Sequence, residues 1–442
     1  MKRTAIDRAQ LIRNELLRVD GQVPEAHLPK HRKMASNPFV FLRGSAQLFY
    51  ADLASGYLSL PKALQKLPLT TVMGDCHTSN FGFLSEEGSH GDSIIFSPND
   101  FDDACIGHAS WDLARFCTSL VLCVDYAQGL SEGRYTSETD IQNKPVINSE
   151  DLKPALRQFL QSYLEMCQNG IDQPNNRRQI LTGFKKSHIL HKRYQKALNR
   201  AYGGSEFTLK SSLAKEVDIE KNPLKFHSRP ERFRRLNKVE YKSIAQNFEP
   251  YVDDHILDIV ERLNAGTGSV NMGRYYLLVG PKKYQGKQDL GLCHVVEVKQ
   301  QRHAAPLYHY PKISPINRLN PAHLTVNCQQ KMQRRPDLVL DEAEWKGTHW
   351  LVRSRHHTRV GIDPEHITFG KKAHQGGFIQ YAATCGEALA LAHCRGDRRS
   401  VQFETMVAKV LPDAIDELIE STLTYAETVK TDCAILNQLL DY

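Results

Sequence analysis

The most constraining feature of this sequence is a pair of acidic turns within residues 71–115, each flanked by apolar runs. The first turn, GDCHTSN, carries Asp75, His77 and Asn80, and the second, NDFDD, carries Asp100 and Asp102. The apolar runs at 81–84 and 93–96 are joined by a polar, glycine-containing loop, a pattern that predicts a β-hairpin. Such a hairpin returns the second turn beside the first, so we expect the two turns to form one site.

Carboxylates and a carboxamide on neighbouring turns are the groups with which a phosphoryl-transfer site holds its base and its magnesium. A structural alternative is that Asx-rich turns only cap strands and helices. The following segment, SWDLARFCTSLVLCVDYA, predicts a largely buried helix capped by Ser110. Asp112 in its first turn is expected to bind a loop N–H or the helix terminus.

A second motif lies in the later half of the chain. A predicted helix at 251–263 leads into the glycine-rich segment that contains Gly266, Gly268 and Ser269, and apolar runs at 274–280 and 293–298 follow. The second run ends in Lys299. Glycine lets backbone N–H groups approach phosphates, and a lysine binds phosphate oxygens as a point charge. Together they indicate a phosphate-binding unit, although each alone is common in turns and strands.

Arg43 is the single interior cation of the apolar stretch 37–53. An unpaired buried charge is costly, so this side chain requires a partner. It is expected either to clamp an anion or to form a structural ion pair with a nearby carboxylate.

The composition is that of a globular protein, with 442 residues, 41% hydrophobic and 24% charged. The charged N-terminal segment does not resemble a signal peptide, and no apolar run is long enough to span a bilayer. The ten cysteines are scattered and include no C-x-x-C pair, which predicts reduced thiols and a cytoplasmic location.

The net charge of +7 is concentrated in residues 177–242, where 18 Lys or Arg face six Asp or Glu. This segment is either a surface for phosphates, nucleic acid or anionic lipid, or a solvated helical region whose charge aids solubility. A basic helix over 177–202 is expected within it. The oligomeric state does not follow from the sequence.

These motifs resemble a bacterial family known as domain of unknown function 2252. Its pattern includes F-x-R-G, G-D-x-H-x-x-N-F-G, N-D-F-D-(D/E), W-D-L-x-R, a G-x-G-S loop, a strand that ends in K-E, and A-H-x-R-x-G-D. The matching segments keep this order along most of the chain: 41–44, 74–82, 99–103, 111–115, 266–269, Lys299 and 392–397. The chain departs from the pattern at Gln300, where an acid is usual, and in the late motif, which is one residue short.

The first turn also looks like the catalytic loop of aminoglycoside phosphotransferases and choline kinases. That resemblance implies that Asp75 accepts the proton of a substrate hydroxyl and that Asn80, Asp100 and Asp102 hold Mg²⁺. It further implies that the loop at 266–269 covers the phosphates of ATP while Lys299 pairs with them. The acceptor is then expected to be a small molecule. The HCRGD segment at 393–397 is a rival catalytic motif, but no Asn follows at the required distance, and a helix end explains it.

Kinases place the glycine loop and lysine before the catalytic loop, whereas here both follow it. The sequence therefore predicts an α+β, protein kinase-like bilobal fold that is circularly permuted. We expect residues 1–130 to form the catalytic-loop half of the large lobe, 131–250 a basic helical insertion, 251–355 the small lobe, and 356–442 the helical remainder.

Three other functions remain compatible with the same residues. An adenylyl transferase would bind the nucleotide in the opposite direction. A non-catalytic nucleotide-binding or regulatory protein would not need Asp75 as a base. A metal-dependent phosphoester hydrolase would use the acidic cluster as a two-metal site and would not need the glycine loop or Lys299.

Overall fold

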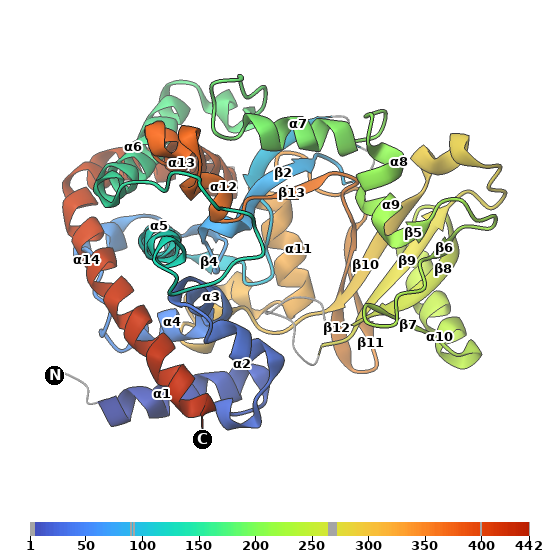
Figure 1. Cartoon of the computed structure of the whole chain (residues 1–442), viewed down its shortest axis with the longest axis horizontal. Coiled ribbons are helices and arrows are strands. Elements are labelled where there is room, and N and C mark those ends of the chain that lie inside the picture. The colour runs from blue at the N-terminus through green and yellow to red at the C-terminus, as the bar shows by residue number, and fades with distance from the viewer. Residues whose placement is uncertain (1–4, 89–90, 92, 264–271, 398–399, 442) are drawn as a thin grey trace.

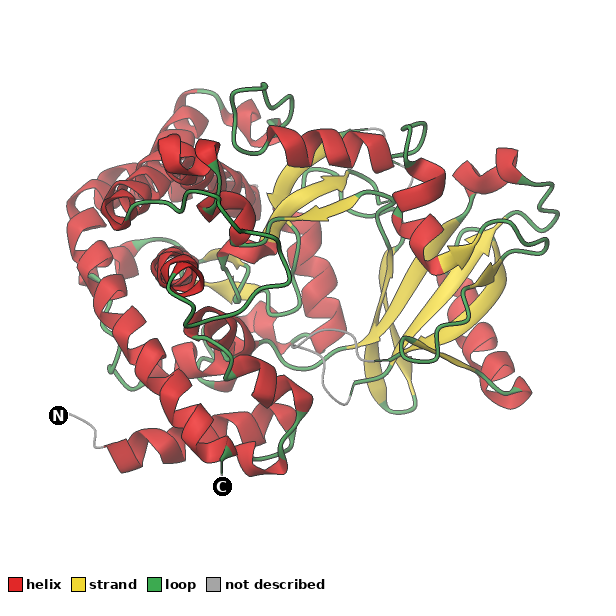
Figure 2. Cartoon of the chain, in the orientation of Figure 1, coloured by secondary structure: helices red, strands yellow, loops and turns green. Residues whose placement is uncertain are grey.

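The computed structural model of the chain describes residues 5–88, 91, 93–263, 272–397 and 400–441. The fold is mixed α+β. Most helices gather on one side, here called the helical lobe, and a six-stranded sheet stands on the other side, here called the sheet lobe (Figures 1 and 2).

The helical lobe is built around α5 (Ala109–Ser131), whose side chains are buried along nearly its whole length. This burial explains why the sequence of α5 is apolar with only scattered polar residues. The long amphipathic helix α14 (Gln402–Leu440) and the packed pair α6 (Leu152–Asp172) and α13 (Phe378–Gly396) surround it. The remaining helices of this lobe are α1 (Ala5–Asp20), α2 (Pro29–Met34), α3 (Pro38–Gly44), α4 (Ala46–Ala54) and α12 (Glu365–Thr368).

Two small antiparallel sheets support the acidic turns. One pairs β1 (Thr70–Val72) with β4 (Cys105–Gly107), and the other has the order β13 (Arg359–Gly361), β2 (Phe81–Ser85), β3 (Ile94–Pro98). The predicted hairpin at 81–96 is confirmed as the β2–β3 pair. The helix predicted after it is also confirmed, but it begins at Ala109 and Ser110 does not cap it.

The sheet lobe contains an antiparallel sheet of order β11-β12-β10-β9-β8-β7. Its strands are β7 (Phe233–Arg235), β8 (His255–Arg262), β9 (Arg274–Gly280), β10 (His294–Gln300), β11 (Leu340–Trp345) and β12 (Thr348–Ser354). Helix α11 (Pro321–Met332) lies between β10 and β11 in sequence and contacts both β12 and α13. The other elements are α7 (His191–Arg200), α8 (Phe207–Lys210), α9 (Ser212–Glu216), α10 (Lys238–Phe248), β5 (Val217–Asp218) and β6 (Lys225–Phe226).

The predicted helix at 251–263 is wrong, because this segment contains β8, an interior strand between β7 and β9. Both faces of this strand are covered. Val260 packs into the cluster that includes Tyr276, whereas Ile259 packs into the opposite cluster with Phe248. A strand buried on two faces loses the alternation of polar and apolar residues. Its apolar residues then also fit the spacing expected of a helix.

One further expectation about local structure needs correction. The basic helix predicted over 177–202 is confined to α7, because Leu181 pairs with Phe96 of β3 and Gly183 has a positive φ.

Strands β11 and β12 form a hairpin. Lys346 and Gly347 both have positive φ, as a tight turn between β11 and β12 requires.

All ten cysteines lie in the described part of the chain, and each is a buried free thiol. Within the described residues, no helix combines the length and the apolar character that crossing a bilayer requires.

The backbone at Gly74 fixes how closely the two acidic turns approach. Its φ is +75°, and a Cβ at this position would overlap the backbone carbonyl of Asp103 in the second turn. We therefore predict that Gly74→Ala lowers the free energy of unfolding by more than about 2 kcal/mol, measured by urea denaturation. The matched control is Gly133→Ala, which has the same left-handed φ with open space around it and should cost only about 1 kcal/mol. Equal losses in the two variants would contradict the close approach.

Candidate functional site

The first acidic turn is held by a buried carboxylate of α5. Asp112 is fully buried and accepts hydrogen bonds from the backbone N–H groups of Met73 (2.6 Å) and Gly74 (3.1 Å). Tyr50 fixes the same turn from α4, because its hydroxyl donates to the Gly74 carbonyl at 2.6 Å. The role expected for Asp112, binding a loop N–H, is confirmed. The turn that carries Asp75 is therefore anchored on two sides.

Asp75 is paired through one of its two oxygens. The buried Arg115 guanidinium donates to Asp75 Oδ1 from both Nε (2.9 Å) and Nη2 (2.6 Å), while a fifth of the Asp75 side chain stays exposed. Burial alone would raise the pKa of Asp75, but the charge of Arg115 and the nearby His77 ring hold it well below its usual range. Asp75 is thus a fixed carboxylate whose Oδ2 is not taken by Arg115.

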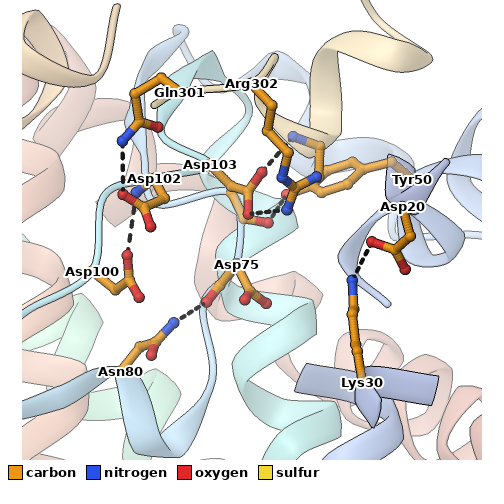
Figure 3. Close-up of polar contacts among 12 residues, drawn as sticks. Asp20, Lys30, Tyr50, Asp75, Asn80, Asp100, Asp102, Asp103, Gln301 and Arg302 are labelled. Carbon is orange, nitrogen blue, oxygen red and sulfur yellow. Dashed lines mark hydrogen bonds and ion pairs between the residues drawn. The ribbon is translucent and has the colours of Figure 1, made fainter. Parts of the chain in front are cut away.

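His77 and Asn80 complete the first turn, and Figure 3 shows Asn80 beside Asp75. The Nε2 atom of His77 lies 3.6 Å from Asp75 Oδ2, and burial lowers the pKa of His77 to about 4, so its imidazole is neutral at pH 7. Asn80 donates from Nδ2 to the backbone carbonyl of Asp75 at 2.9 Å. This bond orients the Asn80 carboxamide and leaves its oxygen as an acceptor that can serve as a metal ligand.

The second turn places two carboxylates beside a lysine of the sheet lobe. Asp102 accepts a hydrogen bond from Lys299 of β10, a residue 197 positions away in sequence, and its backbone N–H donates to Asp100 Oδ1 at 3.3 Å. Burial would raise the pKa of Asp102, but Lys299 and Arg353 hold it well below its usual range. Burial and the neighbouring Asp102 charge raise the pKa of Asp100 to about 6. Figure 3 shows these carboxylates and those of the first turn in one region.

An arginine cluster behind Lys299 is a part of the site that the sequence analysis missed. Glu297, two positions before Lys299 on β10, is 1% exposed and faces three arginines. Its oxygens lie 3.2 Å from Arg274, 3.0 Å from Arg353 and 3.5 Å from Arg355. Because alternate residues of a strand share a face, the spacing of Glu297 and Lys299 could have placed both toward the same neighbours. Their arginine partners are Arg274 on β9, Arg353 on β12 and Arg355 just after β12, and these could not be found that way.

Cations exceed carboxylates around this cluster. A small cavity between the lobes is lined by side chains that include Asn99, Phe101, Arg353 and Arg359. Burial lowers the pKa of the Arg359 guanidinium, and Arg355 and Arg353 lower it further. Arg359 forms no ion pair within 4 Å of a described carboxylate. The lining also includes Glu297 and Asp337, so its three arginines exceed its described carboxylates by one.

Arg43 does not form the structural ion pair with a described carboxylate that was one of its two predicted roles. Within the described residues it forms no ion pair, its buried Nε has no hydrogen-bond partner, and its guanidinium lies 5.7 Å from the Phe39 ring centroid. Burial lowers its pKa, while the charges of Asp75 and Asp363 act in the opposite direction. The structural ion pair is thus not formed with any described group, and the anion clamp stays a prediction.

The remaining sequence candidates divide into two groups. Gly266, Gly268 and Ser269 lie outside the described residues, between the end of β8 and the start of β9. His393 of the rival motif is fully buried, with Nε2 3.1 Å from Asp112 Oδ2 and Nδ1 2.8 Å from the Tyr163 hydroxyl. These contacts give His393 a structural role at the end of α13.

Comparison with known proteins gives one match. A family described as "Uncharacterized protein conserved in bacteria (DUF2252)" matches residues 22–438. The chain belongs to this family. No curated protein and no solved structure matches it. Membership in the DUF2252 family confirms the resemblance inferred from the motifs but brings no activity with it, so the function must be argued from the geometry.

The raised pKa of Asp100 predicts a pH-dependent stability. The native state keeps the Asp100 proton up to about pH 6, whereas the unfolded chain releases it near pH 4. The native state then binds more protons than the unfolded state between these values, so stability falls as pH rises through this window. In urea denaturation, Asp100→Asn should gain stability relative to wild type between pH 4 and pH 6. The exposed Asp413→Asn should show no such trend, and a constant difference for Asp100→Asn would refute the assignment.

Proposed function

We propose that this DUF2252 protein is a phosphotransferase that uses ATP and Mg²⁺ to phosphorylate a hydroxyl group on a small molecule. The observation that carries the proposal is the contact between Lys299 of the sheet lobe and Asp102 of the acidic turn. It joins the residue expected to bind nucleotide phosphates to the residues expected to hold magnesium. A lysine and an Mg²⁺-binding aspartate near each other are what phosphoryl transfer from ATP requires.

The order of elements in the sheet lobe supports a kinase-like fold. The glycine-rich segment lies between β8 and β9, Lys299 is on the next strand, and α11 follows before β11 and β12. Protein kinases use the same succession of glycine loop, lysine strand and helix. One departure is that α11 has no glutamate to pair with the lysine, and Lys299 instead binds Asp102.

A circular permutation accounts for the reversed order of the lobes. In an unpermuted chain, the helix before the catalytic loop would lead directly into β1. Here α13 continues into α14 instead, yet its end adjoins β1, because the Thr70 hydroxyl donates to the His393 carbonyl at 2.7 Å. Gly396, the last residue of α13, also lies against Thr70 and Thr71, so only a short link would join the two elements.

The oxygen atoms of the second turn fit magnesium. Mg²⁺ prefers one or two carboxylates, with phosphate oxygens and water completing its coordination. Asp100 and Asp102 are adjacent carboxylates. Burial and the Asp102 charge raise the pKa of Asp100, and a divalent cation would relieve the repulsion between the two carboxylates. Asn80 offers a third oxygen. The cation would neutralise charge on the transferred phosphoryl group, as it does in other phosphotransferases.

Asp75 is the group proposed to meet the acceptor. The acceptor hydroxyl would attack the γ-phosphorus, the bond between that phosphorus and the β–γ bridging oxygen would break, and ADP would leave. The hydroxyl proton would pass to Asp75 Oδ2, the oxygen that Arg115 does not bind. Because the pKa of Asp75 is held low, this carboxylate acts mainly by orienting the hydroxyl and takes the proton late.

The competing functions fit the geometry less well. A two-metal hydrolase needs a larger ligand set, and no group of three or more His, Cys, Asp or Glu side chains in the described parts of the chain is arranged to hold a metal. A binding-only protein has no use for the anchored, half-free carboxylate of Asp75. Adenylyl transfer uses the same residues, and only the position of the transferred label separates it from phosphorylation.

The test is label transfer from ATP. We expect the purified protein with MgCl₂ to move label from γ-labelled but not α-labelled ATP onto an acceptor in a library of small hydroxyl compounds. Lys299→Met, Asp75→Asn and Asp100→Asn should each lower the rate by about 100-fold or more. The control Lys287→Met removes an exposed lysine paired only with Glu220 and should leave the rate unchanged.

The other outcomes identify the alternatives. Transfer of the α-label would make the protein an adenylyl transferase. ATP binding without transfer of either label would favour a binding protein, and hydrolysis of p-nitrophenyl phosphate without ATP would favour a hydrolase. If calorimetry detects no ATP binding, the proposal fails.

A further inference from the structure

One face of α7 concentrates cations that have no carboxylate partner. Arg193, Lys196 and Arg200 are spaced three and four residues apart, which places them on the same side of the helix. None of the three side chains forms a hydrogen bond or an ion pair with any residue that the structure describes. Burial lowers the pKa of Lys196, and the charges of Arg200, Arg193 and Lys215 lower it further. These side chains repel one another.

Arg200 gives the strongest evidence in this group for an anion-binding role. The residue is only 9% exposed to solvent. Its buried Nε atom has no hydrogen-bond partner among the described atoms. Burying part of a guanidinium without a hydrogen-bond partner costs free energy unless an anion compensates the charge. Packing does not demand an arginine here, since α7 covers β2 and β13 with Tyr194, Ala197 and Leu198.

Two of these cations, Lys196 and Arg200, line a concave site of about 780 Å³, here called the basic cavity. Three separate parts of the chain line it: α7 with the residues before it, the segment around α8, and Lys372. The cationic lining residues are Lys186, Lys192, Lys196, Arg200, Lys210 and Lys372. Among the described residues, the only lining carboxylate is that of Glu206, which is already paired with Lys210.

A contact between the segments that line the basic cavity fixes their relative positions. Lys372 donates to the carbonyl of His188 at 3.1 Å, which ties the segment before α13 to the residues that lead into α7. Figure 1 shows α7 spanning the top of the molecule from the helical lobe toward α8. The cations are therefore gathered by the fold and do not result only from the basic composition of residues 177–242.

We infer that the basic cavity binds a small molecule that carries several phosphate groups. Lysine ammonium groups and an arginine fork are the donors that phosphate oxygens accept. A single-stranded nucleic acid would require aromatic side chains on which bases stack, and the lining residues that the structure describes include no Phe, Tyr or Trp. This binding site is independent of the proposed phosphotransfer, because none of its lining residues belongs to the acidic turns or to β10.

The test uses inorganic tripolyphosphate as the probe, titrated by calorimetry in 100 mM KCl. Wild type should bind it, and binding should raise the thermal midpoint by mass action. The double variant Lys196→Gln/Arg200→Gln should bind about tenfold more weakly or worse, since two charge-assisted contacts are lost. The control Lys238→Gln/Lys242→Gln removes two exposed cations from the same basic segment and should bind as wild type does.

A second pair of measurements separates this site from the others. Lys299→Met should leave tripolyphosphate binding at the basic cavity unchanged, whereas it should abolish any contribution from the proposed nucleotide site. Without ligand, Lys196→Gln/Arg200→Gln should melt at or above the wild-type temperature, because removing mutually repelling charges relieves the native state. If that variant does not fold, Lys192→Gln/Lys196→Gln, which leaves the buried Arg200 intact, provides the same comparison.

Three results would overturn the inference. The first is that the wild-type protein does not bind tripolyphosphate. The second is that the double variants bind it as tightly as the wild-type protein does. The third is that fluorescence anisotropy shows a 20-nucleotide single-stranded RNA binding through Lys196 and Arg200, while tripolyphosphate does not bind. That last result would assign the cavity to nucleic acid.

Discussion

The fully buried carboxylate of Asp112 is the interaction on which the rest of the site depends. It accepts the N–H groups of Met73 and Gly74 and also faces His393, which in turn contacts Tyr163. One side chain therefore links the acidic turn to α5, α13 and α6. Because a buried polar network is stable only when every member is satisfied, the turn that carries Asp75 cannot shift without breaking contacts in three helices.

The charged groups of the molecule are of two kinds, those that opposite charges in the protein compensate and those that they do not. Asp75 and Glu297 are compensated by arginines, so their charges are fixed in the folded chain. Asp100, Arg43, Arg359 and the cations of α7 are charged groups without full compensation inside the protein. An incompletely compensated carboxylate is suited to a cation, and incompletely compensated cations are suited to phosphates. Both proposals rest on this difference.

Local structure was predictable where one pattern dominated. The hairpin at 81–96 is present, and the apolar runs at 274–280 and 293–299 form the strands β9 and β10. The segment 251–263 was misassigned because burial of β8 on both faces removed the alternation that marks a strand. The basic segment was misassigned because a pairing with β3, which depends on distant residues, overrode helix propensity near Leu181.

The sequence by itself determined which residues could perform chemistry and which of them share a turn. It identified Asp75, Asn80, Asp100 and Asp102 because their neighbours along the chain fix them on one hairpin. Only the tertiary structure brought Lys299 to Asp102 and Arg115 beneath Asp75, gathered three arginines on Glu297, and left the cations of α7 without partners. These contacts join residues far apart in sequence, and their formation depends on the path of the whole chain, which no local pattern encodes.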